Sequence, residues 1–341
     1  MHTAIIADIH GNYPALIKVV ENAVSNGVDK FIFAGDYIFD LPFSNEVTRF
    51  LMNLDSAYFV KGNKEGYLSK LANDNQENWI YNQMAVIYQT FRELESEVFD
   101  FLNNLDEECN IKLSSGKSIY VAHIPPFFSA IRMGFFKTLG YSSSSFHKRM
   151  CETPFTHEQF LSEFGDIVNS DECKSIIDKI DADVIVFAHD HLQKYAYCRD
   201  KLIINPGSCG QPLDCNTAAA YTILEETSDG FKVHEKRVAY DIEAVISEAK
   251  KSMTYQKGRI WSEIVFLSMK TAKDYSGIFF ELPNKSPASK NEANENYIRE
   301  RGSLFDNDTW EEAYEVFASK YKENKGNFYR EKQGEDECLK Q

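Results

Sequence analysis

The sequence predicts an α/β protein with a mixed β-sheet, and two observations support this prediction. Within the first hundred residues, short apolar runs of strand length alternate with segments of helical spacing. After residue 183, several strand-like runs follow one another with little helix between them. Alternation favours parallel neighbours and consecutive strands favour antiparallel ones, so we expect both kinds of pairing.

The first helix is the best-defined element of the N-terminal half. Asn12 is an expected N-cap, Pro14 lies in the first turn, and Gly27 ends the helix. The apolar residues between them recur at helical spacing. The other expected elements are strands at residues 3–7, 30–34 and 57–60, a helix near residues 47–54, and a long helical stretch over residues 76–105.

The second half is richer in strands. A hairpin is expected around Ser115 and Gly116, because two strand-like runs flank this turn-forming pair. The expected strands are residues 110–113, 118–122, 183–187, 194–198, 201–204, 219–224 and 231–237, and the expected helices are residues 156–180 and 241–253.

The pattern changes near residue 255, so we expect one domain over residues 1–254 and a C-terminal extension over residues 255–341. Residues 283–296 contain no large apolar side chain and are expected to form a mobile loop. The aromatic residues of the segment around Trp310 recur at helical spacing and predict a short amphipathic helix.

The charge balance limits the classes of partner. The 341 residues include 37 basic and 52 acidic side chains, which makes broad binding to nucleic acid or an anionic membrane unexpected. The N-terminus lacks signal-peptide features, and no run approaches the ~18 apolar residues of a membrane span. We therefore expect a cytoplasmic protein that acts on a small molecule, with the oligomeric state left open.

The cysteines indicate neither a disulfide framework nor a cysteine-type zinc site. Their number is seven, which is odd, and none of them form a CxxC pair. Reduced thiols are the simplest expectation for a cytoplasmic protein.

Residues of metal-ligand type follow five of the expected strands. The set comprises Asp8, His10, Asp36, Asn63, His123, His189 and His191. In α/β sheets, sites assemble at the carboxyl ends of strands, so these side chains are expected to converge. Each motif alone has an ordinary explanation as a turn, a cap or a satisfied core histidine; the argument for metal binding rests on all five together.

The order D-x-H, G-D, G-N, H and x-H-x-H resembles the calcineurin-like metallophosphoesterase superfamily. The segment N-P-G-S-C-G-Q-P at residues 205–212 is similar to the bacterial YfcE-like branch of that superfamily. The resemblance covers about residues 1–250. It implies a two-layer mixed β-sandwich flanked by helices, with a dinuclear metal centre at one edge.

The resemblance also implies roles for the seven residues. Asp8, His10 and His191 would hold one divalent ion. Asn63, His123 and His189 would hold the other, and Asp36 would bridge the two. Imidazole, carboxylate and amide ligands suit Mn, Fe, Zn or Ni, and Mn²⁺ is the first choice in vitro. Asp36, His123 and Lys64 are the expected catalytic residues.

The implied reaction is hydrolysis of a phosphomonoester or phosphodiester by a two-metal mechanism, in which a metal-bridging hydroxide attacks phosphorus. The substrate would be a small-molecule phosphate ester or a nucleotide. Two alternatives stay open: a non-catalytic binding or scaffold protein on the same fold, and a phosphoprotein phosphatase, although the latter would need an open polar groove.

Lys64 marks a departure from the family pattern. It stands where relatives commonly carry a histidine that contacts the phosphate. Lys64 either supplies positive charge to the phosphate or is a solvated lysine, and a lysine is a poor general acid near neutral pH. Asp190, between two expected ligands, either orients a ligand histidine or is an exposed turn residue. Residues 124–150, rich in aromatic side chains, form either a wall of the substrate pocket or a lid packed by its own aromatics.

Overall fold

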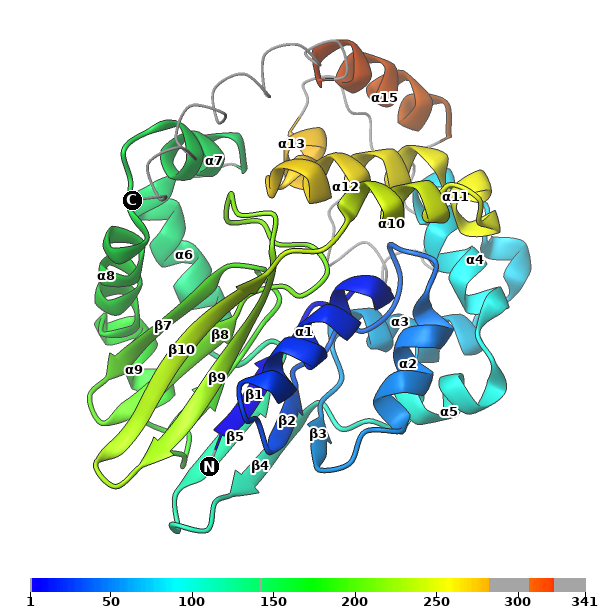
Figure 1. Ribbon diagram of the computed structural model, residues 1–341. Coiled ribbons are helices and arrows are strands. Elements are labelled where there is room, and N and C mark those ends of the chain that lie inside the picture. The colour runs from blue at the N-terminus through cyan, green and yellow to red at the C-terminus, as the bar shows by residue number, and fades with distance from the viewer. Residues whose placement is uncertain (1, 141–142, 282–306, 322–341) are drawn as a thin grey trace, which may run out of the picture.

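The computed structural model describes residues 2–140, 143–281 and 307–321. Its centre is formed by two five-stranded mixed sheets (Figure 1). The first sheet has the order β10 (Gly230–Val238), β9 (Ala219–Thr227), β1 (His2–Ile6), β2 (Lys30–Phe33) and β3 (Ala57–Phe59). The second has the order β4 (Glu108–Lys112), β5 (Ser118–Ala122), β6 (Val184–Val186), β8 (Lys201–Pro206) and β7 (Gln193–Cys198).

The two sheets pack face to face. Ile5 and Ile32 of the first sheet lie in one apolar cluster with Val121, Val186 and Ile204 of the second, and all five side chains are buried. Strands β1, β2 and β3 are parallel neighbours, as are β5, β6 and β8, whereas β9 and β10 pair antiparallel. The predicted two-layer mixed β-sandwich flanked by helices is confirmed.

Helices cover both outer faces of the sandwich. A core cluster joins the first sheet to α1 (Tyr13–Ser25), α2 (Ser44–Met52), α3 (Asn63–Ala72), α4 (Ala85–Glu93) and α5 (Ser96–Asn103). Another joins the second sheet to α6 (Phe128–Leu139), α8 (His157–Val168) and α9 (Asp171–Ile177), with α7 (Ser143–Glu152) at its margin. The expected N-cap of α1 is confirmed, because the Asn12 side chain accepts a hydrogen bond from Ala15 N.

Three expected helical stretches are divided. Residues 76–105 form two 3₁₀ turns (Gln76–Asn78 and Asn82–Met84), α4 and α5, because the chain is extended at Leu94 (ψ 130°). Ser170 separates α8 from α9 by capping the second helix. Ser252 likewise begins a new helix, so α10 (Ile242–Ala249) and α11 (Met253–Lys257) replace one helix over residues 241–253. Serine hydroxyls that satisfy free N–H groups favour such breaks.

The C-terminal helices form their own apolar cluster against the rest of the chain. It joins α10, α12 (Arg259–Thr271), α13 (Tyr275–Phe280) and α15 (Asn307–Tyr321) to Leu41 and Val86. Figure 1 shows α10, α12 and α13 beyond the upper ends of the strands. The predicted amphipathic helix is confirmed as α15, which buries Trp310 and Phe317. The expected loop at residues 283–296 lies outside the described residues.

The cysteine expectation is wrong for one pair, since Cys151 and Cys215 form a disulfide. Spacing could not reveal it, because 64 residues separate the two cysteines. Four other cysteines in the described ranges are free thiols. Within residues 2–140, 143–281 and 307–321, no helix is long and apolar enough to span a membrane.

Candidate metal centre

The structure brings all seven expected ligand residues together. Asp8 and His10 follow β1, Asp36 follows β2, and Asn63 begins α3 directly after β3. From the second sheet, His123 follows β5, and His189 and His191 follow β6. The site therefore lies where the carboxyl ends of the parallel strands of both sheets meet.

Five of these seven residues have a left-handed backbone. The φ angles are 53° at Asp8, 51° at His10, 57° at Asp36, 78° at His189 and 61° at His191. Side chains other than glycine rarely adopt this conformation, and it costs free energy at each position. Such strain persists where the surrounding structure imposes it, as at functional sites.

Gly35 allows the two sheets to approach at the site. Its φ is 93°, and a Cβ there would lie 2.7 Å from the Gly62 Cα and 2.7 Å from the His123 Nδ1. A side chain at position 35 would push His123 away from Asp36. The glycine preceding Asp36 is thus required by space as well as by backbone conformation.

The side chains form two neighbouring groups, with the Asp36 carboxylate between them. Ligand atoms of Asp8, His10 and His191 lie within 4.8 Å of one another, as do those of Asp36, His123 and His189. Asp36 Oδ2 lies 3.8 Å from His10 Nε2 and 3.5 Å from His123 Nε2, between the groups. Asn63 Oδ1 lies 3.1 Å from His123 Nε2.

The histidine orientations test whether the residues suit a metal. His123 Nδ1 donates to Ala34 O and His191 Nδ1 donates to Gln211 O, both at 2.7 Å. His10 Nδ1 lies 2.8 Å from Asp40 Oδ2. With a proton on Nδ1, each of these rings turns Nε2 toward the cluster, where the neutral form offers a lone pair to a metal. His10 Nε2 and His191 Nε2 are 3.0 Å apart, an arrangement of two lone pairs that a cation between them would stabilise.

Asp8 provides a second test. Its Oδ1 is buried and has no hydrogen-bond partner among the described residues. It lies 3.5 Å from His191 Nε2 and 3.9 Å from His10 Nε2. A buried carboxylate oxygen without a partner is costly. A divalent ion would satisfy it, so the residues present fit a metal.

Burial keeps most of the imidazoles neutral. It lowers the pKa of His10 and lowers that of His191 well below its ordinary value. For His189, burial lowers the pKa to about 3, aided by the positive charges of His123 and Arg132. Neutral imidazole is the form that binds a metal.

Asp36 and His123 behave as an ion pair. Burial alone would raise the pKa of Asp36, but the charge and hydrogen bond of His123 hold it below its usual range. Burial would lower the pKa of His123, and Asp36 instead raises it to about 10. Burial raises the pKa of Asp8 well above its ordinary value. The cluster of carboxylates therefore attracts positive charge.

Glu65 orders the turn that presents Asn63, and sequence reasoning missed it. Its buried carboxylate accepts hydrogen bonds from the backbone N–H groups of Asp36, Tyr37 and Gly62, each at 2.9 Å. Lys64 N donates to Asp36 Oδ1 at 2.8 Å. The G-N-K-E segment held the available signal, since an acidic residue three positions after an N-cap forms a capping box.

Lys64 is buried, so its interpretation as a solvated lysine is wrong. Its Nζ lies 2.8 Å from Asp40 Oδ2, and its side chain is 4% exposed. The same carboxylate meets His10 Nδ1, and its Oδ1 accepts from Trp261 Nε1 at 2.7 Å. Sequence reasoning missed Asp40 and Trp261, because the indole comes from α12, 221 residues along the chain.

Asp190 contacts a buried lysine rather than a ligand histidine. Its carboxylate accepts from Lys194 Nζ at 2.6 Å and from Asn205 Nδ2 at 2.9 Å. Lys194 is fully buried beneath the rings of Phe135, Phe164 and Phe187. The pair fixes the turn that carries His189 and His191.

A cavity of about 890 Å³ opens from this cluster. One side is formed by the expected ligands, including Asp36 and His189, and the other by aromatic residues of α6, α7, α12 and α13. Helices α6 and α7 supply most of the aromatic side chains of residues 124–150, and these aromatics contribute both to this wall and to the core cluster of the second sheet. Lys64 and Arg132 also line the cavity.

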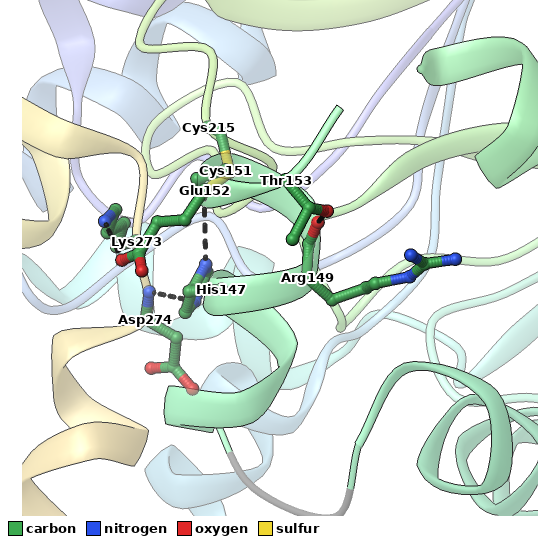
Figure 2. The surroundings of a disulfide bond; sticks show 8 residues. All are labelled: His147, Arg149, Cys151, Glu152, Thr153, Cys215, Lys273 and Asp274. Carbon is green, nitrogen blue, oxygen red and sulfur yellow. Dashed lines mark hydrogen bonds and ion pairs between the residues drawn. A yellow bond between two sulfur atoms is a disulfide. The ribbon is translucent and has the colours of Figure 1, made fainter. Parts of the chain in front are cut away.

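His147, Cys151 and Cys215 form a third group of ligand-type residues (Figure 2), and His147 also lines the cavity. The two sulfurs form the disulfide, and metals bind thiolates. His147 Nε2 accepts a hydrogen bond from Asp274 N at 2.6 Å, which places the imidazole proton on Nδ1, facing Cys151 Sγ at 3.8 Å. This group is therefore a disulfide with the Nδ1–H donor of His147 beside it.

Comparison with known proteins adds a sequence relative and solved structures. The chain is 28% identical over 253 residues to the uncharacterized protein MJ0912 of Methanocaldococcus jannaschii. The aligned region covers 73% of this chain and 92% of that protein. A metallophosphoesterase from Sphaerobacter thermophilus is similar in structure, with a TM-score of 0.55, 18% identity, and coverage of 80% of this chain and 99% of that one.

The hypothetical protein PH1004 from Pyrococcus horikoshii OT3 has a similar structure, with a TM-score of 0.54 and 17% identity. The match covers 76% of this chain and 97% of that one. At these identities the two structures support the fold alone. The model of the calcineurin-like phosphoesterase family matches residues 1–193, more than half of the chain. These residues include all seven members of the cluster, and the chain belongs to the calcineurin-like phosphoesterase family.

Proposed function

We propose that the protein is a metal-dependent phosphoesterase that hydrolyses a phosphomonoester or phosphodiester bond by a two-metal mechanism. The observation that carries this proposal is the convergence of seven ligand-type residues from five strand ends. Five of these residues line one cavity: His10, Asp36, Asn63, His189 and His191. Membership in the phosphoesterase family supports the reaction class.

In this proposal, Asp8, His10 and His191 would hold one ion, and Asn63, His123 and His189 would hold the other. Asp36 would serve both ions, since its Oδ2 lies 3.8 Å from His10 Nε2 and 3.5 Å from His123 Nε2. When bound, two divalent ions such as Mn²⁺ supply a water activated for attack and neutralise charge on the phosphate.

The chain itself positions these groups. Asp40 holds the ring of His10, while the carbonyls of Ala34 and Gln211 hold His123 and His191. The Lys64 ammonium forms an ion pair with Asp40, the carboxylate that also contacts His10. Its positive charge therefore acts on this carboxylate behind the expected ligand. We therefore expect the leaving oxygen to depart without a proton from Lys64, and turnover to fall steeply as the leaving-group pKa rises, because general-acid help is typically worth about 10²–10⁴-fold.

The experiment is a hydrolysis screen of Mn²⁺-reconstituted protein on phosphopeptides and on aryl phosphates and aryl phosphodiesters of graded leaving-group pKa. Wild type should turn over the esters of the more acidic phenols fastest. Asp36→Asn should abolish turnover, whereas Asp55→Asn, at an exposed turn residue, should leave it unchanged.

Two results would contradict the proposal. Absence of hydrolysis by protein that holds both ions would favour the binding or scaffold alternative. Exclusive activity on phosphopeptides would favour the phosphoprotein phosphatase alternative.

A further inference from the structure

A cationic side chain near the candidate metal centre would strengthen binding of a phosphate ester, but the two lysines that flank the Gly62-Asn63 pair both contact other groups. Lys64 Nζ pairs with Asp40. Lys61 Nζ donates to Asn103 O at 2.9 Å. The remaining Lys or Arg among the described residues that line the cavity is Arg132.

Arg132 is placed to reach a substrate. It lies on α6, whose Phe128 packs edge-on against His189 with ring centroids 5.1 Å apart. Positions 128, 132 and 136 are successive i, i+4 neighbours and share one helix face. The guanidinium lies 5.2 Å from the ring of Phe136, and within the described parts of the chain it forms no ion pair with a carboxylate. An exposed guanidinium held on an aromatic ring is ready to bind phosphate oxygens in a bidentate manner.

Apolar side chains from α6, α7, α12, α13 and the segment after β8 also line the cavity. We call Phe128, Phe136, Phe146, Leu213, Val265 and Phe280 the apolar wall. Four of its members are only partly buried: Phe136, Phe146, Leu213 and Phe280. A cavity of about 890 Å³ has room for a drug-sized ligand, far more than inorganic phosphate alone requires.

We propose that Arg132 and the apolar wall are the substrate-recognition elements of this site, with Arg132 binding the phosphate oxygens and the wall binding an aromatic group of the ester. This inference rests on the proposed function, because it takes the ligand to be a phosphate ester. It names the substrate class as phosphoesters of alcohols that carry a planar aromatic group.

The test uses two phosphonates that cannot be hydrolysed. Phenylphosphonate and methylphosphonate share the anionic head and differ in the group offered to the wall. Their affinity for the full-length Mn²⁺-loaded protein is measured by calorimetry, which requires no turnover. Burial of a phenyl ring should make phenylphosphonate bind about 10- to 30-fold more tightly than methylphosphonate.

The variants separate the two parts of the proposal. Arg132→Ala should weaken both ligands about 10-fold or more, with Arg132→Lys in between, because a charged hydrogen bond is lost. Phe146→Ala should reduce the phenyl preference and leave methylphosphonate unaffected. Arg149→Ala is the matched control, since Arg149 lies on α7 over Phe155 and 3.7 Å from Glu163. Metal content, measured for every variant, should stay at the wild-type level.

Equal affinity of wild type for the two phosphonates, or unchanged binding in Arg132→Ala, would overturn the inference. The proposed function fails separately: it is refuted if Mn²⁺-loaded wild type binds phenylphosphonate through Arg132 yet does not hydrolyse phenyl phosphate or its diester. Turnover of phenyl phosphate that is insensitive to Arg132→Ala would refute the inference alone.

Discussion

Asp40 connects three parts of the chain at one carboxylate. It meets His10 Nδ1 and Lys64 Nζ with Oδ2, and Trp261 Nε1 with Oδ1. A carboxylate behind a ligand histidine fixes the ring orientation and raises its basicity. The C-terminal segment thus acts on the candidate metal centre through one indole N–H, without supplying an expected ligand.

Asp40→Asn should weaken binding of the ion at His10 by about 10–100-fold, because it removes the charge behind the ring. Trp261→Phe, which removes one hydrogen bond, should have a smaller effect in the same direction. Mn²⁺ titration of the apoprotein, with Asp55→Asn as control and circular dichroism as a check of folding, measures both. Wild-type affinity in Asp40→Asn would refute a positioning role for Asp40.

At the residue scale, the sequence predicts which side chains gather but not what holds them. The seven residues could be found because each follows a strand-like run, and parallel strand ends meet. Asp40 could not be found, since it belongs to no spacing pattern and its partner Trp261 is 221 residues away. Left-handed φ at residues such as Asp8 and His191 is also invisible in a sequence, because it is imposed by the surrounding fold.

Helix α7 is held to the rest of the molecule by covalent and polar contacts. Cys151 is bonded to Cys215, and His147 accepts from the backbone N–H of Asp274 (Figure 2). At its N-terminus, the Ser143 hydroxyl donates to Asp274 Oδ2 at 2.8 Å. These contacts set the position of the cavity edge.

Protonation of His147 should destabilise the apoprotein. Burial lowers the pKa of His147 to about 4, below the ordinary 6.5 of the unfolded chain. The unfolded state therefore binds this proton first, and stability is lost as pH falls from 6.5 to 4, by an amount on the order of 3 kcal/mol. In His147→Asn this loss should be absent, so the difference between the two proteins in urea unfolding, measured across that pH range, isolates it. Parallel pH profiles would contradict the prediction.

Removing the disulfide should destabilise the fold. A bridge that closes a loop of 64 residues constrains the unfolded chain by about 4 kcal/mol in the chain-entropy model. Wild type without reductant should unfold at higher urea concentration than with dithiothreitol. Cys151→Ser/Cys215→Ser should match the reduced protein and show no response to reductant. An unfolding midpoint of the wild type that is the same with and without reductant would argue against the disulfide.

At the element scale, strands were predicted better than helix boundaries. Residues 30–34 and 219–224 lie in apolar runs that are buried in the sandwich, so these strands could be predicted directly from the sequence. The helical stretches divide at Leu94, where the backbone is extended, and at Ser170, which caps the next helix. Neither division could be predicted, because the pattern of polar and apolar residues continues without interruption through both positions. The Cys151–Cys215 pairing depends on tertiary contacts alone.

In the whole molecule, the carboxyl ends of strands from both sheets lie at one edge of the sandwich, and the C-terminal helices cover that edge. Trp261 and Val265 of α12 line the cavity and also belong to the C-terminal apolar cluster. The layered architecture could be predicted because the family resemblance covered about residues 1–250. The contribution of α12 to the cavity could not, since that segment carries no distinctive motif.

The metal content of the purified protein tests the central claim most directly. After Mn²⁺ reconstitution and removal of free ions, elemental analysis should find close to two ions per chain. Asp36→Ala should lose more metal than His10→Ala or His123→Ala, because Asp36 Oδ2 lies within 3.8 Å of both Nε2 atoms. Wild-type protein that retains no metal, or an Asp36→Ala variant that retains both ions, would contradict the assignment of a dinuclear centre.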